Sequence, residues 1–131
     1  MDNVAELKLL ASKEPVSAFL GMELLELEAG HARVGMTVTE HHINFLNTVF
    51  GGIVMALADQ AFGYAANSLR RPSVASQFNI HLLTAPAVGD RLFAEGRVLK
   101  GGRRVGVSEV VVTNQDGKLI ARATATTIPV D

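Results

Sequence analysis

The sequence predicts an α+β fold in which a curved antiparallel sheet of about six strands wraps around one long central helix. Residues 49–69 form a single helical segment that is apolar nearly all round, and such a helix is buried on most sides. After this segment the hydrophobic period changes to two and stays there to the end of the chain. A sheet that curls around the helix accounts for both patterns.

The N-terminal residues predict two short helices. Residues 3–12 carry apolar side chains at helical spacing, and Pro15 ends this helix. Residues 16–20 are expected to form a second helix, which Gly21 stops.

A hairpin follows, with its turn at Ala29-Gly30. Its second strand alternates cleanly between polar residues and an apolar set made of Ala32, Val34, Met36 and Val38. The polar segment 40–48 then leads into the central helix, which is expected from about Val49 to Leu69.

Four more antiparallel strands are expected after the central helix. The breaks between them fall at residues 86–90, 100–104 and 114–118, and the last two contain hairpin turns with glycine. One alternating face of each strand comprises, in chain order, Val74, Ser76, Phe78, Ile80 and Leu82; Leu92, Ala94, Gly96 and Val98; Val105, Val107, Glu109 and Val111; and Leu119, Ala121, Ala123 and Ala125. Six strands around one helix define a fold of the hotdog type.

Composition and net charge limit the kinds of partner and compartment expected for this chain. The 131 residues are expected to form one domain, 1–131, with a net charge of -1 that favours neither nucleic acid nor an anionic membrane as a partner. Polar residues, among them Asn47, Asp59, Gln60, Asn67 and Ser68, interrupt the apolar segment 47–68, which argues against a membrane span. There is no cysteine and no signal-peptide pattern, so a cytoplasmic protein is expected. The hydrophobic share of 48% suggests interfaces in a homo-oligomer, although a generous core would explain it as well.

Asp59 is the unusual residue of the central helix. Because the helix is apolar nearly all round, Asp59 is expected to be buried. An ionised carboxylate in an apolar site needs hydrogen bonds, a raised pKa or contact with water. It is either a structural aspartate or a catalytic base or nucleophile.

Two nearby features favour catalysis. Gly51 and Gly52 open the helix, where free N–H groups and the helix dipole polarise a carbonyl oxygen. Asn44 lies just upstream, although a lone asparagine is usually a turn or cap residue.

The spacing along the helix suggests two chains. Asp59 follows Gly51 by eight residues, which places them about 12 Å apart along the axis. They therefore have separate roles, or two antiparallel helices in a two-fold dimer bring Gly51 of one chain to Asp59 of the other.

The segment "NFLNTVFGGIVMALADQAFGYAANS" resembles the signature of hotdog-fold acyl-CoA thioesterases of the phenylacetate-degradation type, and residues 74–125 resemble the strands of that family. The resemblance implies an acyl-CoA substrate and dimers or tetramers with active sites between subunits. The sequence contains no phosphate loop or dinucleotide fingerprint, so no cofactor is expected. It implies that Asp59 acts as base or nucleophile, that Asn44 is the family's asparagine, and that the Gly51 amide holds the thioester carbonyl.

The chain departs from the family motif at two positions. Phe50 replaces the family's histidine, and Asn47 stands where glycine is usual. His41 and His42 lie too early in the sequence to be that histidine. Phe50 cannot donate a hydrogen bond to the substrate.

Other residues are weaker candidates. Ser76 is expected on the helix-facing side of its strand, where it either orients a water for Asp59 or is simply a satisfied buried hydroxyl. Arg103 and Arg104, with Lys100, form a basic hairpin for the phosphates of coenzyme A, unless they are only solvated. The four histidines show no ligand spacing, so no metal is expected.

The leading hypothesis is hydrolysis of an acyl- or arylacyl-CoA thioester, with Gly51, Gly52 and Phe50 near the substrate carbonyl. A non-catalytic hotdog protein that binds acyl-CoA or lipid is the alternative that Phe50 suggests. A hotdog dehydratase is disfavoured because the helix lacks the histidine that such a site needs.

Overall fold

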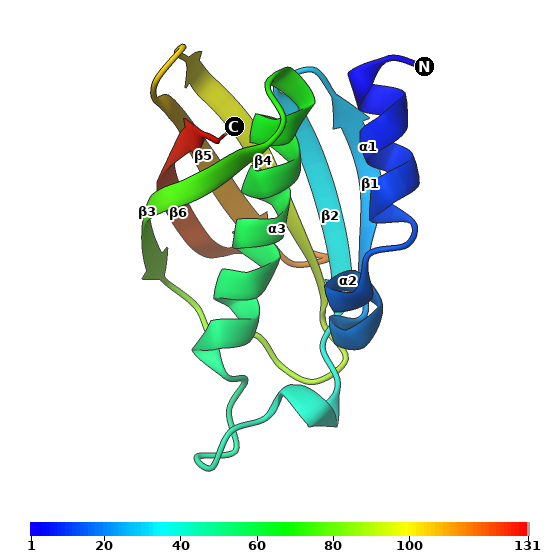
Figure 1. The fold of residues 1–131 in the computed structure, drawn as a ribbon. Coiled ribbons are helices and arrows are strands. Elements are labelled where there is room, and N and C mark those ends of the chain that lie inside the picture. The colour runs from blue at the N-terminus through cyan, green and yellow to red at the C-terminus, as the bar shows by residue number, and fades with distance from the viewer. Residues whose placement is uncertain (131) are drawn as a thin grey trace.

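The computed structural model describes residues 1–130 and confirms the predicted α+β architecture (Figure 1). Six strands form one antiparallel sheet in the order β1-β2-β4-β5-β6-β3, and the sheet curves around helix α3. The elements are α1 (Asn3–Ala11), α2 (Pro15–Leu20), β1 (Met22–Glu28), β2 (His31–Thr37), the 3-10 turn η1 (Glu40–His42), α3 (Gly51–Leu69), β3 (Ser73–Leu82), β4 (Arg91–Gly101), β5 (Gly106–Thr113) and β6 (Leu119–Pro129).

Local sequence signals explain the N-terminal elements, as expected. The Asp2 side chain accepts a hydrogen bond from the Ala5 amide and caps α1. Pro15 occupies the first turn of α2, and Gly21 ends this helix with a φ of 75°. Gly30, with a φ of 78°, makes the β1–β2 turn. Helix α3 begins at Gly51, two residues later than predicted, because Val49 still pairs with Ile43 in a β-bridge.

The core lies between α3 and the concave face of the sheet. The alanines Ala58, Ala61 and Ala65 are fully buried on the sheet-facing side of the helix. Opposite them, a Cβ added to Gly96 of β4 would lie 2.7 Å from the Ala61 carbonyl oxygen. The helix backbone therefore rests directly on β4, and only glycine fits at this contact.

A cluster of polar side chains joins α2 to α3. Glu14 Oε1 accepts hydrogen bonds from Ser17 Oγ at 2.7 Å, from the Tyr64 hydroxyl at 2.5 Å and from the Gln60 side-chain amide. Burial and the bond to Glu14 raise the pKa of Tyr64 to about 12. Tyr64 therefore remains a hydrogen-bond donor at any physiological pH and fixes α2 against the middle of α3.

The face of β5 that packs on α3 is not the one that the sequence singled out. The alternation is present, but the buried residues are Ser108, Val110 and Val112. Val105 is exposed, and Val107, Glu109 and Val111 are half-buried on the other face. Valines occupy both faces of this strand, so the pattern alone does not identify the inner face.

The prediction for the start of β3 is also wrong. The pairing of β3 with β6 shifts by one residue between Ala75 and Gln77, so Ser76 forms a β-bulge. As a result Val74 and Ser76 do not share a face with Phe78 and the residues after it. Ser76 is exposed, and its hydroxyl donates to the Thr126 carbonyl at 3.4 Å.

The contact at Gly96 generates a prediction about stability. Gly96→Ala should lower the free energy of unfolding by about 1–3 kcal/mol, because the new methyl group pushes α3 away from the sheet. Gly101→Ala in the same strand is the matched control, since its Cβ would make only an ordinary contact of 3.5 Å with Leu69. Urea unfolding of both variants measures the difference, and equal losses would show that the close approach is not required.

Candidate active site

One stripe of α3 is left uncovered by the sheet. Met55 is 40% exposed, Asp59 is exposed, and Gly52 and Gly63 on the same stripe are half-buried. The expectation that Asp59 is buried is therefore wrong for the single chain. The residue lies on the open side of an otherwise apolar helix.

The Asp59 carboxylate is not engaged in the structure of the chain. Although the side chain is exposed, neighbouring protein atoms remove part of the water around its carboxylate, and this partial desolvation raises the pKa of Asp59 above its ordinary value. No ion pair or hydrogen bond from residues 1–130 opposes this effect. An open carboxylate with a raised pKa and no structural partner is suited to act as a base or nucleophile.

The N-terminus of α3 presents free backbone donors. Its N-cap is Phe50, whose side chain makes no capping hydrogen bond. The Phe50 amide donates to the His42 carbonyl at 2.8 Å and the Ile53 amide to the Phe50 carbonyl at 2.9 Å. The amides of Gly51 and Gly52 have no such partner among residues 1–130, so they are available to a bound carbonyl oxygen.

Both glycines at this helix end have a neighbouring side chain packed close against them. A Cβ on Gly51 would lie 2.8 Å from a Leu82 methyl carbon, and a Cβ on Gly52 would overlap the ring of Phe50. The Phe50 ring thus packs over Gly52, in the position where the family has histidine, and is itself exposed.

Asn44 organises the loop that delivers the chain to this helix end. Its Oδ1 accepts hydrogen bonds from the amides of Leu46 at 3.0 Å and Thr48 at 3.1 Å and from the Thr48 hydroxyl at 3.1 Å. The backbone N–H of Asn44 donates to the Thr48 carbonyl at 2.8 Å, and Ile43 pairs with Val49 in a β-bridge. The Asn44 side-chain NH₂ has no partner within residues 1–130 and remains free to donate.

The same loop explains the departure at position 47. Asn47 has a φ of 61°, the left-handed conformation that glycine adopts without strain and that asparagine tolerates better than most residues. His42 is buried and accepts a hydrogen bond from the Thr39 amide at its Nδ1. It therefore supports the loop and does not replace the missing histidine.

The predicted site residues fall into separate groups. Asn44, Phe50, Gly51 and Gly52 lie together at the start of α3, and Asp59 lies two turns further along this helix. Arg103 and Arg104 lie beyond the opposite end of α3, where the Arg70 guanidinium donates to the Arg103 carbonyl at 3.3 Å. Ser76 is on the bulge of β3, away from the helix-facing side.

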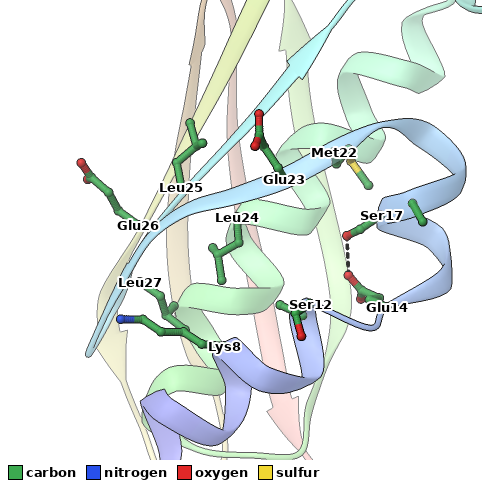
Figure 2. Close-up of a pocket in the computed structure, with 12 residues that line it drawn as sticks. Lys8, Ser12, Glu14, Ser17, Met22, Glu23, Leu24, Leu25, Glu26 and Leu27 are labelled. Carbon is green, nitrogen blue, oxygen red and sulfur yellow. Dashed lines mark hydrogen bonds between the residues drawn. The ribbon is translucent and has the colours of Figure 1, made fainter.

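A well-defined groove of the described chain lies away from these residues. A pocket of about 560 Å³ lies between the N-terminal helices and β1, with the hydrogen-bonded Glu14 and Ser17 at one side (Figure 2). None of the five main pockets found in residues 1–130 is lined by Asn44, Gly51 or Asp59. The candidate catalytic residues are thus on an open surface of the single chain.

Two features, one at each end of α3, were missed from the sequence. Large apolar side chains surround the helix start, with Phe45 94% and Leu46 67% exposed. Arg70 joins the basic hairpin. The sequence signal for the apolar surface was the pair Phe45 and Leu46 inside an otherwise polar loop. The sequence signal for the larger basic cluster was Arg70, directly after the central helix.

The described residues contain neither a metal-binding cluster nor a membrane-spanning helix. Among residues 1–130, no cluster of three or more histidine, aspartate or glutamate side chains is arranged to hold a metal ion. No helix in this part of the chain is long and apolar enough to cross a membrane.

Comparison with known proteins identifies similar sequences and structures. The family model of the thioesterase superfamily matches residues 46–121. The acyl-coenzyme A thioesterase PaaI of Escherichia coli is 37% identical over 102 residues, which cover 78% of this chain and 73% of that protein.

Solved structures agree with the sequence matches. The E. coli PaaI protein of the phenylacetic acid degradation operon superposes with a TM-score of 0.89 at 28% identity, covering 98% of this chain and 96% of that one. A Streptococcus mutans protein bound to acetyl CoA superposes with a TM-score of 0.79 at 32% identity, covering 82% of this chain and 86% of that chain.

The raised pKa of Asp59 predicts a pH-dependent effect on stability. The folded protein holds this proton more tightly than the unfolded chain, so ionisation of Asp59 destabilises the fold as the pH rises through the folded-state pKa. Asp59→Asn should therefore be more stable than the wild type at pH 7, by up to about 0.5 kcal/mol as is usual for a surface position. The gain should shrink as the pH falls through the raised pKa of Asp59 in the folded protein and should be absent below the ordinary aspartate pKa of about 3.9. Urea unfolding of both proteins between pH 3 and pH 7 measures the difference in their free energies of unfolding. A variant less stable than the wild type at pH 7 would mean that Asp59 has a structural role.

Proposed function

The chain belongs to the thioesterase superfamily, and from this membership we propose that it hydrolyses an acyl- or arylacyl-coenzyme A thioester at a site shared by two copies of the chain. Its enzyme class is that of its relatives, the acyl-CoA thioester hydrolases. The products are the free acid and coenzyme A.

The observation that carries the proposal is the separation of Gly51 and Asp59 on one straight helix. Both residues are on α3, eight residues and about 12 Å apart along its axis. One thioester carbon cannot contact the Gly51 amide and the Asp59 carboxylate of the same chain. Two antiparallel copies of α3, related by a two-fold axis near Met55, would bring each Gly51 next to the partner's Asp59.

Exposed apolar residues support this pairing of two chains. Phe45, Leu46 and Phe50 surround the start of α3, Met55 lies on its open stripe, and Leu82 is half-exposed at the end of edge strand β3. An apolar patch around a polar site is typical of a surface that binds another protein. In the proposed dimer this patch encloses the catalytic residues and excludes bulk water.

The roles of the residues follow from their chemistry. The Gly51 amide donates to the thioester carbonyl oxygen and stabilises the negative charge that develops there, with Gly52 beside it. The partner's Asp59 either attacks the carbonyl carbon or takes a proton from the attacking water. If water attacks, the C–S bond breaks to give the free acid directly, and Asp59 passes the proton it took to the coenzyme A sulfur. If Asp59 attacks, the C–S bond breaks to give an acyl–aspartyl anhydride, which a water molecule then hydrolyses to the free acid and regenerated Asp59, with the water proton going to the coenzyme A thiolate.

Asn44 takes part of the orienting role that a histidine would have. Its Oδ1 is committed to the loop, and its free NH₂ group is the donor available to the substrate. Phe50 contributes an apolar wall over Gly52 instead of a hydrogen bond.

A panel of acyl-CoA substrates tests the proposed reaction. The wild type should release free thiol from at least one member, and Asp59→Ala should lower kcat/KM at least a thousandfold, because it removes the base or nucleophile. Asp116→Ala in the β5–β6 turn is the matched control and should retain full activity. Tight binding of acyl-CoA without turnover of any member would instead identify a non-catalytic binding protein.

Mixed dimers test whether the site is shared. Asn44→Ala and Asp59→Ala homodimers should both be nearly inactive. After the two are unfolded, mixed in equal amounts and refolded, about half of the dimers should be mixed, each with one intact site, so about a quarter of the wild-type activity should return. Mass spectrometry verifies the exchange. If mixed dimers form and activity stays absent, the shared site is wrong.

A further inference from the structure

The open stripe of α3 lies between two different neighbours. Successive residues of an α-helix point about 100° apart, so Gln60 points to one side of Asp59 and Phe62 to the other. The Gln60 side chain donates to Ser17 Oγ of α2 at 2.8 Å. The ring of Phe62 packs against Phe78 of β3, with 6.0 Å between the centroids. Asp59 therefore faces outward between α2 and β3.

The β3 side of this stripe belongs to the proposed dimer interface. Leu82 at the end of edge strand β3 is half-exposed, and one of its methyl carbons would lie 2.8 Å from a Cβ added to Gly51. The partner chain covers this side in the proposed dimer. Helix α2, which packs beside α3 in Figure 1, is then the remaining wall beside Asp59.

Helix α2 carries two exposed apolar side chains. Phe19 is 86% exposed and Val16 44%, and residues three apart share one face of a helix. Ser17 points to α3, and Ala18 lines the groove between α2 and β1. Val16 and Phe19 do not line that groove, so they face away from β1. Neighbouring apolar side chains exposed beside a polar site are typical of a binding surface.

The polar cluster fixes α2 in this position. Ser17 Oγ lies 3.2 Å from the Tyr64 hydroxyl, one turn of α3 beyond Gln60. The same hydroxyl donates to Glu14 Oε1, directly before α2, at 2.5 Å. The exposed side of α2 is therefore held at a defined distance from Asp59.

The distance between the helices determines which acyl groups can reach Phe19. The axes of two packed helices lie about 8–10 Å apart. An extended octanoyl chain spans about 8 Å at the reach per bond of an extended backbone. An acetyl group that starts at the same thioester carbon is too short to make this contact.

The chemistry of the two side chains suits the acyl group better than the pantetheine arm. Val16 and Phe19 offer no hydrogen bond through their side chains. The amide groups of the arm need hydrogen-bond partners when they leave water, whereas a hydrocarbon chain gains from burial against an apolar surface.

We propose that Phe19 and Val16 form the wall against which the acyl group of the substrate lies, and that this wall makes the enzyme select apolar acyl groups of about eight carbons over acetyl. The wall belongs to the chain that provides Asp59. This inference rests on the proposed hydrolysis of an acyl-CoA thioester and names the class of acyl group.

A comparison of octanoyl-CoA with acetyl-CoA tests the wall. In Phe19→Ala the ratio of kcat/KM for octanoyl-CoA to that for acetyl-CoA should fall about tenfold, because the long chain loses its apolar contact. Phe19→Leu keeps an apolar side chain and should retain most of the ratio. Leu9→Ala on α1, another exposed apolar position, is the matched control and should keep the wild-type ratio. Since Phe19 is exposed, Phe19→Ala should unfold at the same urea concentration as the wild type.

Direct binding keeps this test separate from the reaction. The thioethers S-octyl-CoA and S-ethyl-CoA cannot be hydrolysed, and calorimetry should show that S-octyl-CoA binds the wild type more tightly and that Phe19→Ala loses most of this preference. Turnover of octanoyl-CoA with an unchanged ratio in Phe19→Ala would overturn the wall and leave the hydrolase intact. Equal affinities of the wild type for the two thioethers would also overturn it. So would a dimer of Phe19→Ala that dissociates on dilution while the ratio stays unchanged, because Phe19 would then be a contact between chains.

Mixed dimers identify the chain that provides the wall. In a dimer of an Asn44→Ala chain and an Asp59→Ala chain, the one intact site takes Asp59 from the Asn44→Ala chain. Adding Phe19→Ala to this chain should lower the ratio of octanoyl-CoA to acetyl-CoA turnover, and adding it to the other chain should not. The opposite result would show that the wall does not lie beside Asp59 of its own chain and would overturn the assignment.

Discussion

The direct contact between the α3 backbone and strand β4 determines how the rest of the molecule is arranged. Gly96 lets the helix approach until the Ala61 carbonyl lies where a side chain would otherwise be, and the small residues of the helix face the same way. Because of this close packing, the sheet covers one side of α3. The opposite side stays open, and it carries Asp59 together with the free amides at the helix start. The packing of the core and the exposure of the candidate catalytic residues are therefore two results of one contact.

Most of the fold could be predicted from the sequence because its signals are local. Turn glycines, Pro15 and the change of hydrophobic period mark nearly every element within two residues. The order of strands in the sheet depends on contacts between distant segments and has no local signal. The inner face of β5 and the bulge at Ser76 were missed for a related reason, since valines on both faces, or one extra residue, leave the alternation itself unchanged.

The sequence predicted which residues form the candidate site, but it did not predict how exposed they are or what lies around them. The positions of Asn44, Gly51 and Asp59 came from a motif and from the spacing along a helix, which the structure preserves. Burial of Asp59 was predicted from the mean composition of the helix, and composition does not tell which stripe a sheet leaves uncovered. Arg70 was missed because its relation to the β4–β5 hairpin exists only after the chain has folded.

The hydrogen-bonded cluster around Glu14 has a spectroscopic consequence. The chain has one tyrosine and no tryptophan, so its near-ultraviolet emission comes from Tyr64. That ring is 6% exposed, and its hydroxyl donates to a carboxylate, a contact that quenches tyrosine fluorescence. When α2 moves away from α3, the quenching contact breaks and the emission rises. Tyr64 fluorescence therefore reports, without any added label, whether α2 is in contact with α3, the helix that carries Asp59.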